Sequence, residues 1–380
     1  MRRIVHLIAE FSSHEAMGRT VTETASRVPG EHFLVTSQAH DGASVFQEVD
    51  ELGGTVASFP LGRTAALAGV LARIQPDVVH LHAGALGPLQ AAMPVLRPYK
   101  TVLTAYAWPT VPGPATWRRA SLAEMRASNV LQPRVALTTL LPPFIATAAL
   151  RRAGVSTVLT PDPRVAARLR GFDVRRLPSG APTDSRRASF SAAAPAVVFA
   201  GRAETVRGLD TLLAAWPSIK SRVPDARLRL LLIPRPELPA ILDRAGALSD
   251  VEVVTTPVPD LLGEFAAAQV GTWPFKFDYT TSPPAMAVAE AMSVGLPVVA
   301  TDVACVRAVL EPGVNGVAVP PARPLALADA IAGLLRDEVG WRRYASAGLE
   351  SVRNQLGWDR AAEVTAGAYA QDLPIASNRR

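Results

Sequence analysis

Two arginines five residues apart are the first candidates for chemistry. In the segment VVFAGRAETVRGLDTLLAAW, a β-rich run ends at Gly201 and Arg202, and Arg207 and Gly208 precede an amphipathic stretch. Loops at the carboxyl ends of parallel strands are where α/β sheets bind ligands, and guanidinium groups match phosphate oxygens in pairs. The pattern indicates either a diphosphate site or two solvated loop arginines.

A single glutamate stands in an otherwise apolar stretch further along the chain. The segment YTTSPPAMAVAEAMSVGLPVVATD begins at Tyr279, and Glu290 is its only acidic residue before the final aspartate. Ser282 is a good N-cap, and the two prolines after it suit a first helical turn. We therefore expect a helix from Ser282 to about Val294, ended by Gly295.

The expected start of this helix is a candidate anion site. Unpaired N–H groups and the helix dipole favour negative charge there, and small residues such as Ala287 let a ligand approach the backbone. A carboxylate on an apolar helix costs free energy unless it is hydrogen-bonded. Glu290 is therefore either a domain-surface glutamate paired with an arginine or an acceptor for sugar hydroxyls, as acidic residues are in dinucleotide folds.

Two histidines in the first half share one face of a strand. His80 and His82 are two residues apart in DVVHLHA, so both side chains point the same way. His82 falls at the carboxyl end of the run and is the better candidate to line a site. His80 is expected to be a hydrogen-bonded core histidine.

Several common catalytic motifs are absent, which narrows the chemistry. The chain has no G-x-G-x-x-G after a strand, no P-loop, no G-x-S-x-G, no D-x-D and no clustered metal-ligand spacing. The sequence therefore lacks the signatures of dinucleotide dehydrogenation, P-loop phosphoryl transfer and serine-hydrolase chemistry. We expect no metal or other cofactor. With one cysteine, Cys305, no internal disulfide is expected.

The composition indicates a folded chain with an anionic partner. Of 380 residues, 49% are hydrophobic and 19% charged, and the net charge is +6. The basic residues are scattered rather than clustered, so we expect a small anionic ligand or a membrane surface and no nucleic acid. The longest apolar stretch, residues 135–150, is too short to span a bilayer and contains two prolines, and no signal peptide is expected.

The order of β-rich and amphipathic segments predicts two α/β domains that would position these residues. Short β-rich runs such as RIVHLIA and DVVHLHA alternate with amphipathic stretches such as TAALAGVLARI, and the pattern resumes with AVVFAGR after a Ser-, Ala- and Pro-rich segment. We expect two doubly wound parallel-sheet domains in tandem. The expected boundaries are a first domain at 1–183, a linker at 184–195, a second domain at 196–355 and a final helix at 356–380 that packs back on the first domain.

Together these motifs resemble the retaining glycosyltransferases of family 4. The resemblance covers nearly the whole chain and is strongest from Val197 to Pro320. The family's second domain opens with a strand, Gly-Arg, a short loop, Lys-Gly and a helix, which here reads Gly201, Arg202, loop, Arg207, Gly208. AMSVGLPVVATD after Glu290 is similar to the family signature AMA.G.PVVA, and VLEPGVNGVAVPP and RRLPSGAPTD are similar to two further motifs.

The resemblance implies a fold, an activity and site residues. The fold would be GT-B: two Rossmann-like parallel-sheet domains facing a central cleft. The activity would be metal-independent, retaining transfer of a sugar from a nucleoside diphosphate sugar to a hydroxyl acceptor. By position, Arg202 and Arg207 would hold the diphosphate and Glu290 the ribose. The other implied donor-side residues are Gly18, Gly201, Thr281, Ser282 and Ala287.

Three positions depart from the family pattern. The first signature glutamate is replaced by Ser282, which puts the donor sugar, and activity itself, in question. The family lysine is Arg207, which keeps the charge but changes its geometry. A family histidine near the donor sugar is replaced by Tyr106, which is either a sugar- or acceptor-binding residue or a packed tyrosine.

The sequence gives less detail about the acceptor and about the location of the protein. His14, His82 and Trp108 are the acceptor-side candidates, and the acceptor is expected to be a natural product, a glycan or a lipid-linked molecule. The protein is expected in the cytoplasm, with at most peripheral contact at the inner membrane face. Two alternatives remain: a non-hydrolysing sugar-nucleotide 2-epimerase, and a nucleotide-binding protein without turnover.

Overall fold

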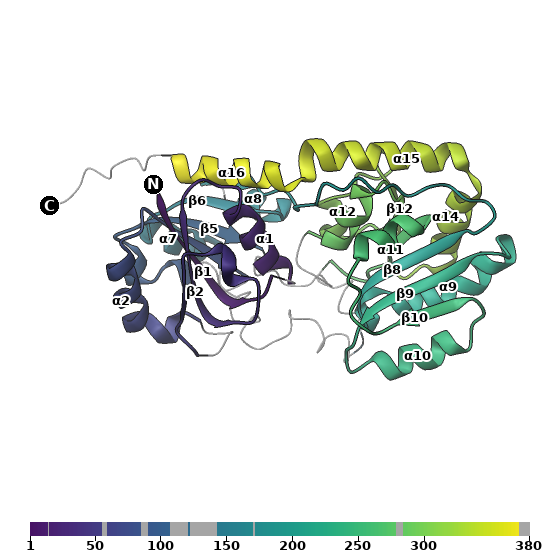
Figure 1. The fold of residues 1–380 in the computed structure, drawn as a ribbon, viewed down its shortest axis with the longest axis horizontal. Helices are drawn as coiled ribbons and strands as arrows, with labels where there is room; N and C mark the ends of the chain where they lie inside the picture. The colour runs from purple at the N-terminus through teal and green to yellow at the C-terminus, as the bar shows by residue number, and fades with distance from the viewer. Residues whose placement is uncertain are drawn as a thin grey trace. The chain divides into compact units, whose positions relative to one another are not determined.

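The structure, a computed structural model, describes residues 1–13, 15–54, 59–84, 90–106, 121, 143–169, 172–278 and 284–371. It contains two compact units, each built on one parallel sheet (Figure 1). Unit 1 holds the described residues of 1–106, 143–178 and 358–371, and unit 2 holds Ser121 with those of 179–357. Apart from Ser121, the described chain passes into unit 2 at residue 179, before the expected linker at 184–195, and returns to unit 1 at residue 358.

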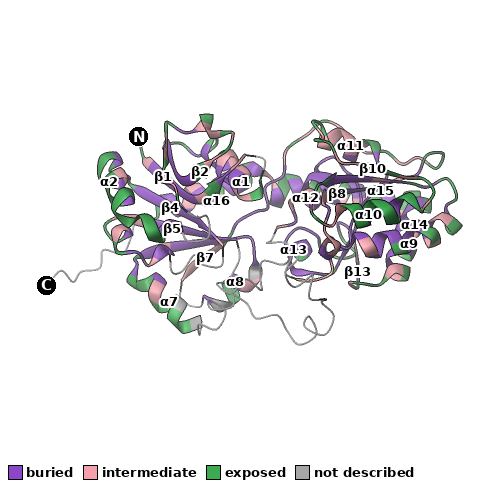
Figure 2. Ribbon diagram, turned by 90° about the horizontal axis from the view of Figure 1, so that it is seen from below, coloured by how far each residue is buried: buried purple, intermediate pink, exposed green. Residues whose placement is uncertain are grey.

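Sheet 1, in unit 1, has seven parallel strands in the order β3-β2-β1-β4-β5-β6-β7. The central strands are almost wholly buried (Figure 2), which explains why they read as continuous apolar runs rather than alternating ones. The strand bounds are β1 Arg3–Phe11, β2 Glu31–Ala39, β3 Glu48–Glu51, β4 Val78–Ala83, β5 Lys100–Ala105, β6 Val155–Thr160 and β7 Asp173–Arg176.

The two faces of sheet 1 carry different cores. One face packs Val5, Leu7 and Leu81 against side chains of α2 (Thr64–Ile74), α7 (Pro143–Arg152) and α8 (Pro163–Arg168). The other face packs Ile8 and Leu34 beneath α1 (Ala16–Ala25). Helix α2 coincides with the amphipathic stretch identified in the sequence. Strand β3, which is short and half exposed, was not predicted.

The last helix of the described chain belongs to unit 1. Helix α16 (Trp358–Ala370) lies beside α1 (Figure 1). Its Tyr369 hydroxyl lies 2.5 Å from Nδ1 of His80, and the Lys100 ammonium donates to the Tyr369 carbonyl at 2.8 Å. These bonds tie the end of the chain to the centre of sheet 1.

Sheet 2, in unit 2, has six parallel strands in the order β10-β9-β8-β11-β12-β13. Its core includes the fully buried Trp216 and Trp273. The strands are β8 Ala196–Arg202, β9 Arg227–Ile233, β10 Val251–Val254, β11 Val270–Trp273, β12 Val298–Thr301 and β13 Val317–Val319. The helices are α9 Leu209–Arg222, α10 Leu238–Gly246, α11 Leu261–Ala267, α12 Met286–Ser293, α13 Ala304–Arg307, α14 Pro324–Arg336 and α15 Glu338–Ser351.

Both sheets are doubly wound, as the sequence predicts. The strand order reverses between β1 and β4 in sheet 1 and between β8 and β11 in sheet 2. Ligands of such sheets bind beyond the carboxyl ends of the strands at these reversals. The loops after β8 and β11 are therefore the expected location of a ligand site in unit 2.

No helix among the described residues is long and apolar enough to cross a membrane.

Candidate functional site

The two arginines lie at the carboxyl end of β8, beside the strand reversal of sheet 2. Arg202 is the last residue of β8, and Arg207 ends the 3-10 turn Thr205–Arg207. The Arg207 guanidinium lies 5.6 Å from the Phe275 ring centroid, and its Nε lies 3.3 Å from the Glu204 carboxylate. Burial lowers the pKa of Arg207, and Glu204 partly offsets this. The side chain is only 15% exposed, so its cation is held in a fixed, partly dehydrated place.

Gly208 fixes the loop that carries Arg207. Its φ is 82°, in the left-handed region that favours glycine, and a Cβ there would lie 1.8 Å from the Pro274 carbonyl oxygen. The backbone N–H of Lys276 donates to the Val206 carbonyl at 3.1 Å. The loops after β8 and β11 are thus in backbone contact, which only glycine permits.

Gly208→Ala is expected to separate these loops. The left-handed backbone and the overlap with Pro274 together should cost about 2 to 5 kcal/mol of unfolding free energy. Urea denaturation measures this directly. Gly333→Ala in helix α14 is the matched control, because a Cβ there meets nothing within 4 Å, and it should be neutral or mildly stabilising. Equal stability of the two variants would show that the loop contact is dispensable.

The loop after β11 adds a cation that sequence reasoning missed. The Lys276 ammonium lies 2.5 Å from Asp210 of α9, and its side chain is 13% exposed. The Thr301 hydroxyl donates to the Phe275 carbonyl at 2.6 Å, which holds the same loop to β12. The signal was present: PFKF follows a buried strand directly, as the arginine loop does.

Helix α12 carries Glu290 near its middle. Glu290 is 5% exposed and is flanked by fully buried Ala289 and Ala291. The helix ends as expected: Gly295 has φ of 71°, and the Leu296 N–H donates to the Ala291 carbonyl. The helix therefore holds a nearly buried carboxylate among apolar neighbours.

The start of α12 differs from the prediction. The helix begins at Met286 and its N-cap is Ala285, so Ser282 is not the N-cap and Pro284 is not helical. The N–H of Ala285 donates to the Cys305 carbonyl and that of Val288 to the Ala285 carbonyl. The Ala285 N–H is thus bonded to the neighbouring turn, and α12 has no side-chain cap of the kind that the Ser-Pro-Pro pattern indicated.

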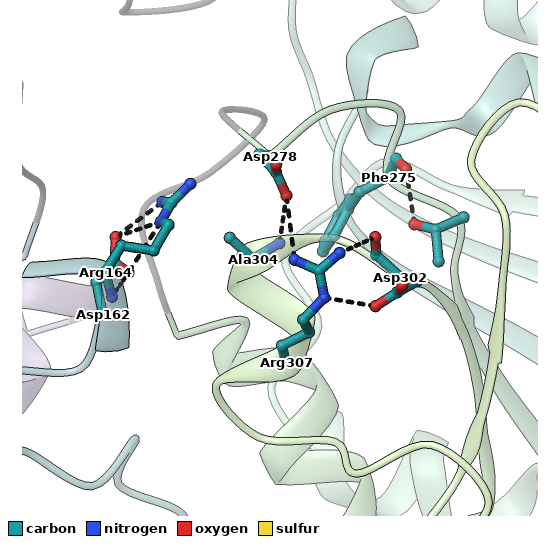
Figure 3. Close-up of polar contacts among 8 residues, drawn as sticks. Asp162, Arg164, Phe275, Asp278, Asp302, Ala304 and Arg307 are labelled. Carbon is teal, nitrogen blue, oxygen red and sulfur yellow. Dashed lines mark hydrogen bonds and ion pairs between the residues drawn. The ribbon is translucent and has the colours of Figure 1, made fainter. Parts of the chain in front are cut away.

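Cys305 lies in that neighbouring turn, which short polar contacts hold in place. Burial raises the pKa of the Cys305 thiol to about 12, so the thiol stays protonated. The Asp278 carboxylate accepts the Ala304 backbone N–H at 2.7 Å, and Arg307 pairs with Asp302 at 2.6 Å (Figure 3). These bonds hold the turn at the start of α13 against the loop after β11.

In unit 1, Gly18 lies where α1 approaches the loop after β1. A Cβ on Gly18 would lie 2.0 Å from the Ser12 carbonyl oxygen, so the helix and the loop are in backbone contact. The Ser13 N–H and hydroxyl both donate to Asp41, at 2.6 and 3.0 Å. Asp162 caps α8 in the same unit and pairs with Arg164 at 2.8 Å (Figure 3).

Tyr106 and His82 lie together at the carboxyl edge of sheet 1. Tyr106 directly follows β5, and its hydroxyl lies 3.4 Å from His82 Nδ1. Both side chains are 4% exposed. His80 is confirmed as a bonded core histidine, with Thr104 at 2.7 Å and Tyr369 at 2.5 Å. The structure therefore brings together the predicted residues within each unit: Gly201, Arg202 and Arg207 in one, and Tyr106 and His82 in the other.

Four predicted site residues lie outside the described residues: His14, Trp108, Thr281 and Ser282. Ala287 lies in the first turn of α12 and is half-buried.

Comparisons with known proteins agree with the motifs of the second half. Residues 194–337 match the family described as glycosyl transferases group 1. The two-unit architecture is that of the GT-B glycosyltransferases. The sucrose-phosphate synthase of Thermosynechococcus elongatus superposes with a TM-score of 0.74 at 18% identity, over 97% of this chain and 98% of that one. Anabaena HepE, solved with UDP and glucose, gives 0.69 at 15% identity over 97% and 99%.

Curated relatives match over about half the chain. A D-inositol 3-phosphate glycosyltransferase of Xylanimonas cellulosilytica is 34% identical over 187 residues, which are 47% of this chain and 42% of the relative. A phosphatidyl-myo-inositol mannosyltransferase of Mycobacterium leprae is 32% identical over 189 residues, 48% of this chain and 50% of the relative. The match thus spans half or less of each relative's length.

Proposed function

We propose that the protein is a glycosyltransferase that moves a sugar from a nucleoside diphosphate sugar to a hydroxyl acceptor. The observation that carries this is the pair Arg202 and Arg207 at the strand reversal of sheet 2, with Arg207 fixed by the backbone contact of Gly208 with Pro274. The family match of this half and the named activities of the relatives support the proposal.

The donor would bind through its diphosphate and ribose. Glycosyl transfer requires that the leaving diphosphate, whose negative charge grows, be stabilised. Arg202 and Arg207 would supply charge-assisted hydrogen bonds, and Lys276, whose ammonium pairs with Asp210, lies on the loop that contacts theirs. The N–H groups of Ala285 and Val288 are already used, so Met286 and Ala287 are the remaining amides of α12 that we assign to the phosphates. Glu290 would accept the ribose hydroxyls.

The reaction would be retaining and independent of metal. The sequence has no D-x-D motif, and two guanidinium groups can offset the charge that a divalent ion offsets elsewhere. The resemblance to family 4 implies that the acceptor attacks on the side of the leaving group. The departing phosphate would then take the acceptor proton, so no pair of carboxylates is needed.

Unit 1 would bind the acceptor, which we assign to a polar hydroxyl compound. Two relatives are named for inositol phosphate or phosphatidylinositol substrates, which makes a cyclitol or a lipid-linked cyclitol the first class to test. Arg151 and Arg152 end helix α7 and are exposed, so a peripheral contact with anionic lipid would place them at the surface.

A thermal-shift panel of sugar nucleotides and nucleoside diphosphates, followed by product analysis, tests the proposal. A bound donor raises the melting temperature by mass action. Incubation without acceptor should leave the donor sugar unchanged or slowly hydrolysed, whereas a 2-epimerase would isomerise it. Stabilisation by a donor with transfer to a cyclitol acceptor supports the proposal. No stabilisation by any donor would overturn it.

A further inference from the structure

Unit 1 contains a layer of four buried histidines that the proposed function does not use. His6 lies on β1, His32 on β2, and His80 and His82 on β4, with His6 directly opposite His80 in the strand register. All four are 5% exposed or less. They lie on the sheet face that α1 covers, where a core would ordinarily be apolar.

Clustered histidines can bind a metal ion, so the cluster is first tested as a metal site. Ligand atoms of His6, His80 and His82 lie within 4.8 Å of one another. However, all eight ring nitrogens of the four histidines already have protein partners. A metal would have to displace a hydrogen bond at each histidine that it used as a ligand. Hydrogen bonding accounts for the cluster without an ion.

Three of the histidines form one continuous chain of hydrogen bonds. His32 Nε2 lies 2.8 Å from the Val28 carbonyl, and His32 Nδ1 lies 2.9 Å from His6 Nε2. His6 Nδ1 lies 3.1 Å from His82 Nε2, and His82 Nδ1 lies 3.4 Å from the Tyr106 hydroxyl. The chain therefore runs from a backbone carbonyl near the start of β2 to the carboxyl edge of β5.

The carbonyl at one end determines the direction of every bond. A carbonyl only accepts, so His32 must carry its proton on Nε2 and accept on Nδ1. The same argument then places the proton of His6 on Nε2, and that of His82 on Nε2. Burial lowers the pKa of all three histidines, which keeps each ring neutral with one proton. His82 Nδ1 is left as an acceptor, and Tyr106 must donate to it.

We propose that His32, His6 and His82 are positioning residues that fix the Tyr106 proton toward His82, so that Tyr106 offers an oxygen lone pair to a ligand hydroxyl at the edge of sheet 1. The ligand part of this inference rests on the proposed function, whereas the order of the chain does not. Tyr106 acts at this edge as an acceptor, and a ligand hydroxyl is its matching donor.

The tautomers are the direct test, and they need no activity. Nitrogen-15 NMR of the full chain, labelled at histidine and recorded near pH 7.5, distinguishes protonated from bare ring nitrogens. His6, His32 and His82 should each show a proton on Nε2 and none on Nδ1, and single His→Phe variants assign the signals. A proton on Nδ1 of any of the three, an imidazolium, or stoichiometric metal in the purified protein would overturn the inference.

Kinetics test the positioning role. His32→Phe removes the anchor two histidines away from Tyr106 and should lower kcat/KM about tenfold, the worth of one well-directed hydrogen bond. His32→Gln, whose amide can accept and donate, should restore most of it. His80→Phe is the packing control: it removes a histidine outside the chain whose ring lies 3.9 Å from that of His82, and it should lower kcat/KM less than His32→Phe does. Equal losses in His32→Phe and His80→Phe would refute positioning, and a wild type with no transfer activity would refute the proposed function while leaving the tautomer result to stand.

Discussion

Arg207→Met should lower kcat for glycosyl transfer by roughly 10²–10³-fold, the usual effect of removing one group that stabilises developing negative charge. The Arg207 guanidinium is held over Phe275 and beside Glu204, and little of it is exposed to water. Water therefore screens its charge only weakly, although Glu204 offsets part of it. Arg207→Lys keeps the charge at a position where the family that the sequence resembles carries lysine, and it should retain most of the activity.

The controls for this prediction separate catalysis from folding. Glu204 keeps a second arginine, Arg235, at 3.9 Å, so loss of Arg207 does not leave it without a cation. The variant should therefore unfold within about 1 kcal/mol of wild type in urea. Arg307→Met, which removes an exposed arginine of α13, should change kcat little. If Arg207→Met loses stability in proportion to activity, or Arg307→Met is equally inactive, the arginine is structural.

The second large effect is on stability at acid pH. Burial lowers the pKa of His6, His80 and His82 well below the ordinary value, and that of His32 less strongly. The unfolded chain therefore binds protons near pH 6.5 that the folded chain does not. Stability is fully present above pH 6.5 and falls as the pH drops below it.

The size of this effect follows from the number of groups. Each deeply buried histidine contributes up to about 1.4 kcal/mol per pH unit, so three together give about 4 kcal/mol per unit at the steepest point. The measurement is urea denaturation between pH 7 and pH 5, monitored by hydrogen exchange of the sheet 1 amides so that unit 1 is observed by itself. His80→Phe should reduce the slope by about a third, and an unchanged slope would show that the cluster is not the cause.

The sequence predicts the fold well because the signals are local. Continuous apolar runs marked the buried parallel strands, and helix α2 matches its amphipathic stretch. Strand β3 was not predicted because its sequence, EVDE, is polar, and the strand lies half exposed at the edge of the sheet. The start of α12 was placed too early because Ser-Pro-Pro is a good local cap, whereas the structure begins the helix at Met286.

The sequence points to candidate site residues where they are contiguous and misses neighbours that only the fold brings close. Arg202 and Arg207 flank one loop and could be read from spacing alone. Lys276 joins them only because β11 is the neighbour of β8, which the sequence does not state. The histidine chain combines residues of three strands, and His6 and His32 have no spacing pattern that would connect them with His82. The residue types are visible in the sequence, but the strand register that brings these residues together is not.

The central claim is that unit 2 binds a nucleoside diphosphate with Glu290 on its ribose. The most direct measurement is calorimetric titration of wild type and Glu290→Gln with the diphosphate that stabilises best, such as UDP, and with its 2′,3′-dideoxy analogue. Wild type should bind the natural nucleotide about 10 to 100 times more tightly than the analogue, the worth of hydrogen bonds to a charged group. Glu290→Gln should bind the two within about threefold of each other. The same preference in both proteins, or no binding of either nucleotide to wild type, would contradict the account.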